Sequence, residues 1–331
     1  GAFCSPYQAD SFVYATVSYR LAQGEVFYRD VADVKPPGLY MLYSLAYRFL
    51  PPERSTMIPV DTVFAVLGYF AVFLLARDIY GRTVAWIVTV TAALALNYFP
   101  MMDFATDGFG LAESFMIFPL ALAARRYLRA TVEQCTKSFL ACGFWIGIAM
   151  MIKQTALPLA VAVAVHWTIS QLIARRDIRA WLRGATAGLA GATIALAPFA
   201  IMIVLQGTSA RAYELLGPGA AGMLGRDTAW PGEWSNVVPI WIPLAWCAFA
   251  VFWRVEHALQ RRTHDAPPAT GPMAFLLLWV ACECVMLVYL PLRASHYYTV
   301  SCLPLVVLAG AFWSSLIRHA ATLPPRLAVA P

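Results

Sequence analysis

Nine charged or titratable side chains fall in short motifs of a largely apolar chain. Together they could transfer a group that leaves as an anion. The acidic ones are Asp10 in QADSF, Asp30 and Asp33 in YRDVADVKPPG, and Asp107 and Glu113 in NYFPMMDFATDGFGLAESF. The basic ones are Lys35 in the same KPP stretch, Lys153 in MIKQTALP, and Arg293 and His296 in LPLRASHYYTVSCLP. Carboxylates serve as general bases or metal ligands, whereas lysine and arginine hold phosphate. The set therefore fits chemistry on an anionic substrate.

Each of these residues also has an ordinary explanation. Charges in loops are commonly just solvated, Lys153 between two apolar runs could snorkel to a membrane interface, and His296 next to two tyrosines fits an aromatic belt. Glu283 in VACECVML lies within an apolar run, where an isolated charge is costly. The sequence leaves two roles open for it: a protonated or hydrogen-bonded group between helices, or a functional group.

The hydropathy of the chain predicts the helices that hold these residues in place. Of 331 residues, 60% are hydrophobic and only 13% are charged, and the mean hydropathy is +0.64. Because a helix needs about 20 apolar residues to cross a bilayer, nine segments qualify or nearly qualify. They are 57–76, 83–99, 111–124, 138–152, 156–174, 184–205, 237–253, 273–290 and 299–317. We predict an all-α, polytopic integral membrane protein with about nine transmembrane helices.

Residues 1–56 precede the first of these segments. The run 38–50 is short and contains Arg48, so we predict a helix that lies on the membrane surface. Residues 1–37 contain no apolar run long enough for a signal peptide or a spanning helix. Two arrangements remain open, an amino terminus outside the membrane or a further helix upstream. We divide the chain into an outer catalytic loop with surface helices, 1–56, and a transmembrane bundle, 57–331.

Basic residues predict the topology. If the nine segments alternate, the connections on one side carry 15 of the 24 lysines and arginines, including Arg125, Arg126, Arg175 and Arg176. This asymmetry marks the cytoplasmic side and places residues 1–56 outside. The formal net charge of +6 is spread over these short clusters rather than along one stripe, so we expect no nucleic-acid partner.

The seven cysteines do not suggest a site. They lie mostly within or beside apolar runs, which favours small buried hydrophobic side chains over a disulfide framework or a zinc site.

Several motifs taken together resemble a known family. In order along the chain they are an early aspartate, G-x-x-x-Y-R-D-x-x-D-x-K-P-P from Gly24, Lys-Gln at 153–154, and R-x-x-H-Y-Y from Arg293 with Leu-Pro four residues on. The combination resembles the bacterial members of glycosyltransferase family 39, in the GT-C superfamily. Protein O-mannosyltransferases and the aminoarabinose transferase of lipid A are relatives. The resemblance covers Asp10 to Pro304.

The resemblance implies a GT-C-like helical bundle with outer juxtamembrane helices in a bacterial inner (cytoplasmic) membrane, with the active face outside. It also implies a first transmembrane helix before Asp10 and an outer loop with a catalytic aspartate. Relatives often have Asp-Glu where this chain has Asp10-Ser11. We therefore expect a single carboxylate at that position.

The expected activity is transfer of a sugar from a polyprenyl-phosphate donor to an acceptor hydroxyl, with inversion. Nucleotide sugars are cytoplasmic, so a donor used outside must arrive on a lipid phosphate. Asp10 is the expected base, because the acceptor must lose a proton. The expected ligands of the departing phosphate are the cations, which oppose the charge that develops on it: Lys35, Lys153, Arg293 and His296.

The remaining acids, Asp30, Asp33, Asp107 and Glu113, are expected to support these groups or to hold a divalent cation; no cofactor is firmly indicated. We expect the site to form one outer cavity that opens toward lipid. The acceptor could be a lipid, a glycan or a protein, and membrane lipids or a partner membrane subunit could bind the chain. Two other functions stay open: a non-catalytic GT-C-like structural subunit of a membrane complex, and a transporter of a lipid-linked substrate.

Overall fold

A computed structural model of the chain describes residues 9–51, 53, 56–102, 111–219, 271–289 and 297–322. Two short helices come first, α1 (Ala9–Ala22) and α2 (Gly38–Tyr47). Six longer helices follow: α3 (Met57–Tyr80), α4 (Arg82–Met102), α5 (Ala112–Glu133), α6 (Thr136–Ile152), α7 (Leu157–Ile173) and α8 (Ile178–Leu205). The last are α9 (Ser209–Glu214), a short π-helix Leu215–Gly219, α12 (Pro272–Tyr289) and α13 (Tyr297–Thr322). The described ranges also contain a 3-10 turn, Gln154–Ala156, a 3-10 residue at Thr56, and an isolated bridge between Phe27 and Val31. The all-α prediction is confirmed.

Eight of the nine apolar segments coincide with the long helices α3 to α8, α12 and α13. The ninth, 237–253, lies outside the described residues, so a total of about nine spanning helices stays a prediction. The largest difference in length is at α5. It continues to Glu133, beyond the apolar segment that ends at 124, because Arg125 and Arg129 pair with Asp78 of α3.

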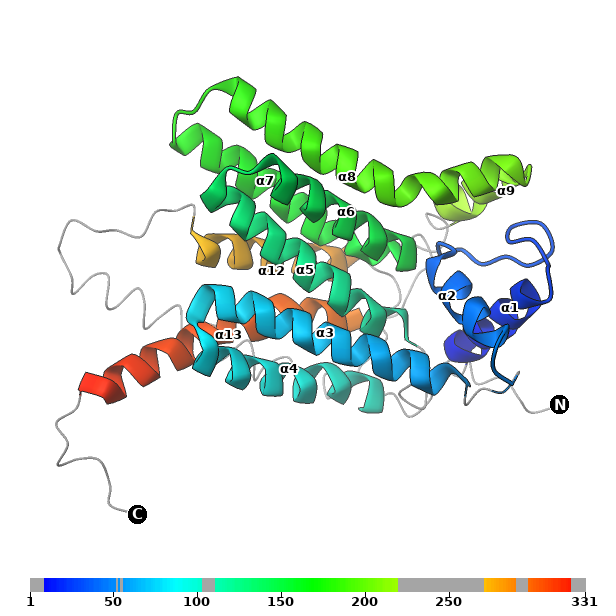
Figure 1. The fold of residues 1–331 in the computed structure, drawn as a ribbon, viewed down its shortest axis with the longest axis horizontal. Coiled ribbons are helices and arrows are strands. Elements are labelled where there is room, and N and C mark those ends of the chain that lie inside the picture. Colours follow the sequence, from blue (N-terminus) through cyan, green and yellow to red (C-terminus); the bar gives the residue numbers. More distant parts are fainter. Residues whose placement is uncertain are drawn as a thin grey trace, which may run out of the picture.

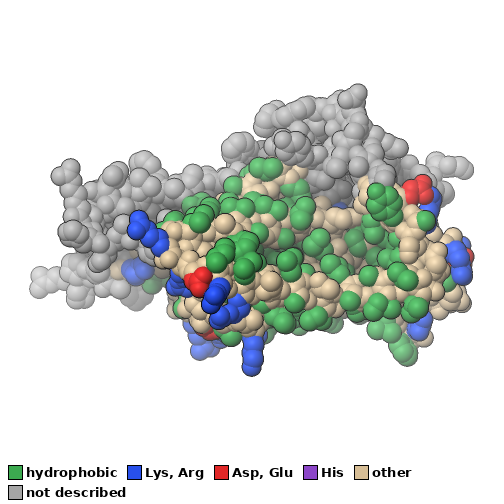
Figure 2. All heavy atoms as spheres, turned by 90° about the horizontal axis from the view of Figure 1, so that it is seen from above, with side chains coloured by type: hydrophobic (Ala, Val, Ile, Leu, Met, Phe, Trp, Pro, Cys, Tyr) green, Lys and Arg blue, Asp and Glu red, His purple; other side chains and the backbone are tan. Residues whose placement is uncertain are grey.

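Several of these helices suit a membrane. By length and composition, four stretches of the described residues could cross one: Met57–Tyr80, Gln154–Ile173, Ile178–Leu205 and Thr299–Arg318. Three shorter apolar helices accompany them: Arg82–Leu96, Thr136–Ile152 and Pro272–Leu287. Figure 2 shows apolar side chains over the middle of one face and charged side chains toward its two ends. This distribution matches a slab of hydrocarbon between two aqueous interfaces.

The long helices run back and forth between two ends (Figure 1). α6 packs against α8 and α5, α5 against α3, α3 against α4, and α4 against α13. α12 closes the bundle against α7 and α13, while α1 and α2 pack on each other across one end. The α3–α4, α5–α6 and α7–α8 connections lie at the other end (Figure 1). These connections carry the arginines predicted to be cytoplasmic, so the basic residues gather at the end opposite to α1 and α2.

Glycines allow α6 and α8 to approach closely. A Cβ atom at Gly143 would lie 1.8 Å from the carbonyl oxygen of Gly188, and one at Gly191 would lie 1.9 Å from that of Leu140. Membrane helices associate through small residues in this way, because lipid supplies no hydrophobic drive for helix contact. The contact fixes the ends of α6, one of which contributes to the candidate active site.

The five described cysteines form no disulfide with one another. Cys142 and Cys302 are buried, as expected from the sequence, and Cys135 and Cys282 are intermediate. Cys284 differs, because it is exposed on the surface of the apolar helix α12. Cys4 and Cys247 lie outside the described residues.

Candidate active site

The segment between α1 and α2 begins with a compact turn that holds Asp30. The chain reverses at Gly24, whose φ of 97° favours glycine. The backbone N–H of Tyr28 donates to the carbonyl of Val31 at 2.7 Å. Asp30 accepts from the backbone N–H of Val26 at 2.8 Å and pairs with Arg29 at 2.9 Å. The hydrogen bond from Arg29, followed by that from Val26, lowers the pKa of Asp30. Asp30 thus builds the turn and stays ionised.

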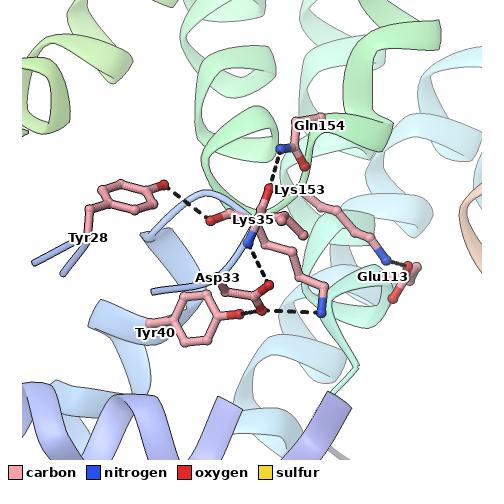
Figure 3. A network of polar contacts seen from close by, with 8 residues as sticks. Tyr28, Asp33, Lys35, Tyr40, Glu113, Lys153 and Gln154 are labelled. Carbon is pink, nitrogen blue, oxygen red and sulfur yellow. Dashed lines mark hydrogen bonds and ion pairs between the residues drawn. The ribbon is translucent and has the colours of Figure 1, made fainter. Parts of the chain in front are cut away.

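Asp33, by contrast, lies beside Lys35 (Figure 3). Its Oδ2 atom is 3.5 Å from Nζ of Lys35 and accepts a short hydrogen bond from the hydroxyl of Tyr40. Its Oδ1 atom accepts from the backbone N–H of Val34 at 2.6 Å. The ammonium of Lys35 also lies 4.8 Å from the ring centroid of Tyr14 on α1, a cation–π contact. Of Asp30 and Asp33, the two acids of this loop, Asp33 is therefore the one that orients Lys35.

The side chain of Lys35 is partly accessible, while its backbone is held by a hydrogen bond. The exposed fraction of its side chain is 14%. The hydroxyl of Tyr28 donates to the carbonyl of Lys35 at 3.2 Å, and burial, aided by the charge of Asp33, raises the pKa of Tyr28 so that it remains a donor. Pro36 and Pro37 follow with restricted φ angles and lead into α2.

This loop docks on the end of α6, more than a hundred residues further along the chain. The side-chain amide of Gln154 donates to the carbonyl of Val34 at 2.9 Å (Figure 3). Three residues after Lys35, a Cβ atom at Gly38 would lie 2.5 Å from the carbonyl oxygen of Met151. The two motifs that the sequence predicted to share a site, KPP and Lys-Gln, are thus in direct contact.

Lys153 follows α6, and in Figure 3 its side chain reaches Glu113 in the first turn of α5. The two side chains form an ion pair, and their exposed fractions are 5% and 1%. Lys153 does not snorkel to solvent. The pair joins the ends of α5 and α6 beside the loop that presents Lys35. That Lys153 itself binds phosphate stays a prediction.

Asp10 lies in the first turn of α1, four residues before Tyr14. Positions four apart in a helix are neighbours on one face, so the backbone places Asp10 one turn from the residue whose ring contacts Lys35. Asp107, Arg293 and His296 lie outside the described residues. α13, which begins with Tyr297, runs from the end that carries α2 toward the opposite end (Figure 1).

Sequence reasoning missed the tyrosines around the site: Tyr14, Tyr28, Tyr40 and Tyr43. Tyr40 binds Asp33, and Tyr43 bonds to Asp61 of α3. The spacing of Tyr40 and Tyr43 could have indicated two of them. Positions 40, 43 and 47 lie on one face of a helix, and all three tyrosines are buried. Each buried phenol carries a hydroxyl that needs a partner. Asp33 supplies it for Tyr40, Asp61 for Tyr43, and the carbonyl of Lys35 for Tyr28.

The side chains that the structure describes do not form a metal site. They contain no group of three or more His, Cys, Asp or Glu placed to hold an ion. Asp30 and Asp33 face different partners, as described above.

Glu283 of α12 is hydrogen-bonded between helices, one of the two roles left open by the sequence. It accepts from the indole N–H of Trp279 at 2.9 Å and from the hydroxyl of Ser301 on α13 at 3.3 Å. Its buried carboxyl group is therefore satisfied within the bundle.

The fold is that of the GT-C membrane glycosyltransferases. It is similar to the crystal structure of ArnT from Cupriavidus metallidurans in the apo state, with a TM-score of 0.65, 17% identity, and coverage of 96% of this chain and 56% of that one. The structure of the same protein bound to undecaprenyl phosphate gives a TM-score of 0.64 at 17% identity and the same coverage. An oligosaccharyltransferase from Archaeoglobus fulgidus, in complex with Zn and sulfate, gives 0.59 at 15% identity over 96% of this chain and 48% of that one. The chain thus spans about half the length of these proteins.

A family model gives the classification. Residues 34–204 match the family described as dolichyl-phosphate-mannose-protein mannosyltransferase, and the chain belongs to this family of multi-pass membrane glycosyltransferases. The resemblance deduced from the KPP, Lys-Gln and HYY motifs is confirmed. No curated protein matches the sequence.

Proposed function

We propose that the chain forms the membrane part of an enzyme that moves a sugar from a polyprenyl-phosphate donor to an acceptor hydroxyl. One observation carries the proposal: Lys35 is held, partly accessible, between Asp33 and the Tyr14 ring, on a loop docked to the Lys-Gln motif. A cation so fixed suits a phosphate that gains negative charge as it leaves. The family of the chain supports the reaction class, and an ArnT structure of the same fold contains undecaprenyl phosphate.

In the proposed reaction, Asp10 takes the proton of the acceptor hydroxyl. The acceptor oxygen attacks the anomeric carbon from the face opposite to the leaving phosphate, and the bond from that carbon to the phosphate oxygen breaks. The electron pair of that bond leaves with the polyprenyl phosphate, whose charge Lys35 opposes. Displacement from the opposite face inverts the configuration of the anomeric carbon.

The other residues have supporting roles in this proposal. The buried pair with Glu113 engages Lys153, so we assign Lys153 to fixing the loop and Lys35 to the donor phosphate. Arg293 and His296 remain proposed ligands of the donor phosphate, and Asp107 remains a proposed supporting acid; all three lie outside the described residues. A divalent cation at Asp30 or Asp33 would compete with the contacts of these carboxylates to Arg29, Tyr40 and two backbone N–H groups. We therefore derive no step through a metal.

Localisation and partners follow from the same proposal. The site lies at the end of the bundle opposite to the basic connections, which corresponds to the outer face of a bacterial inner membrane if those connections are cytoplasmic. A lipid, a glycan or a protein could supply the hydroxyl.

The test is release of polyprenyl phosphate from a polyprenyl-phosphate sugar in membrane vesicles that contain the full natural protein and its native acceptors. We expect release together with a new glycoside, and loss of both with Lys35→Ala. A structural subunit would give neither product in the wild type. A transporter would move the lipid-linked sugar across the membrane without releasing polyprenyl phosphate.

A further inference from the structure

A cavity lies at the basic end of the bundle, far from Lys35, where α6, α7 and α8 meet. Its volume is about 60 Å³. Its walls are formed by Phe139, Trp167 and Gly184, which are buried, and its rim by Gln134, Thr136 and Arg183, which are exposed. One water needs roughly 10–15 Å³ of such space, so the cavity could take a group of roughly four or five heavy atoms, the size of a phosphate.

The walls of this cavity are held by specific contacts. The indole N–H of Trp167 donates to the carbonyl of Trp181 at 3.2 Å, and the rings of Phe139 and Trp167 are 4.5 Å apart. A Cβ atom at Gly184 would lie 2.9 Å from the Trp167 indole. Glycine at this position therefore lets the indole pack directly against α8 and shape the wall.

The charge around the rim is positive. Arg183 has no ion-pair partner among the described residues, and the same holds for Lys137, Arg175, Arg176 and Arg179 on the adjoining connections. Two acids lie on these connections. Glu133 accepts from Ser138 at 3.4 Å, and Asp177 caps α8 by accepting from the backbone N–H of Arg179 at 3.1 Å. At this end of α6, α7 and α8, five cations thus outnumber two carboxylates, which favours an anionic ligand.

Aliphatic side chains continue from the rim along the outside of the bundle. The exposed ones next to the cavity are Leu140 on α6, Leu172 and Ile173 on α7, and Ile178 and Leu182 on α8. A free phosphate would make no apolar contact with this surface, whereas the acyl chains of a lipid would cover it. Basic pockets between membrane helices on the cytoplasmic side bind acidic lipid head groups by the same combination of contacts.

We propose that this cavity binds an anionic phospholipid, with its phosphate at Arg183, Gln134 and Thr136 and its acyl chains along α6, α7 and α8. The site is separate from the candidate active site and does not depend on the proposed reaction. It would hold the α6–α8 layer, on which the KPP loop docks, to the leaflet at the basic end.

The experiment is titration of the full natural protein in detergent with phosphatidylglycerol, and separately with phosphatidylcholine, followed by native mass spectrometry of the bound lipid. The variant is Arg183→Gln. The matched control is Arg82→Gln, an exposed arginine at the same end on α4, a helix that does not line the cavity. Melting temperatures in phosphatidylcholine nanodiscs check that both variants are folded.

We expect wild type to bind phosphatidylglycerol more tightly than phosphatidylcholine. Arg183→Gln should weaken phosphatidylglycerol binding roughly fivefold and Arg82→Gln should leave it unchanged. Equal losses in the two variants, or no loss with Arg183→Gln, would overturn the site. If inorganic phosphate displaced phosphatidylglycerol at millimolar concentration, the cavity would be a site for free phosphate, and the lipid assignment would be wrong.

Discussion

Gly38→Ala should disable the candidate active site without unfolding the protein. The new Cβ atom would lie 2.5 Å from the carbonyl oxygen and 2.9 Å from the carbonyl carbon of Met151, whereas ordinary contact begins at 3.4 Å. Both opposing atoms are backbone, so no side-chain rotation relieves the contact, and α2 must move roughly 0.9 Å away from α6. Lys35 is only three residues away, and Pro36 and Pro37 stiffen the link between them.

A misplacement of about 1 Å can cost on the order of 10²-fold in rate, while overpacking costs about 1–3 kcal/mol of stability. We expect glycosyl transfer in membrane vesicles to fall by about that factor, with the protein still folded in a thermal unfolding assay. Gly188→Ala is the matched control, because its Cβ atom would meet nothing closer than 3.9 Å. Wild-type transfer by Gly38→Ala would show that the contact between KPP and the end of α6 does not position Lys35.

Three further predictions follow from the site and the topology. Lys35→Ala should weaken donor binding and lower kcat/KM by roughly 10² to 10³, because a charge that grows in the transition state loses its counter-ion; normal kcat/KM would remove Lys35 from the mechanism. Glu113→Ala should destabilise the protein by about 3–5 kcal/mol, since it takes the carboxylate from a buried lysine, and the double change with Lys153→Met should recover much of this loss in a thermal unfolding assay. In a background without reactive cysteines, a membrane-impermeant reagent added outside should label Asp107→Cys but not Arg176→Cys; the reverse pattern would invert the topology.

The sequence predicts the long helices well, since about 20 consecutive apolar residues have few alternatives to a spanning helix. It also places Lys35 and Lys153 in one region, through motifs that resemble a family. It does not predict which carboxylate meets which cation. Glu113 and Lys153 are 40 residues apart, and their pairing depends on how α5 and α6 cross.

The contacts of the tyrosines are likewise not predictable from the sequence. Nothing in the sequence near Lys35 indicates that the ring of Tyr14 lies 4.8 Å from its ammonium, because this contact depends on how α1 packs on α2. Asp30 and Asp33 are equivalent in the sequence pattern, yet only Asp33 contacts Lys35. The turn at Gly24 and the hydrogen bonds to Val26 direct Asp30 elsewhere.

Asp10→Asn tests the central claim most directly, because it keeps the size of the side chain and removes the proton acceptor. The measurement is sugar transfer from the polyprenyl-phosphate donor, together with donor binding by the same preparation. We expect turnover to fall by roughly 10² to 10⁴ with the donor still bound. Full transfer by Asp10→Asn would contradict the account and move the base elsewhere, with Asp33 and Asp107 the next carboxylates to test.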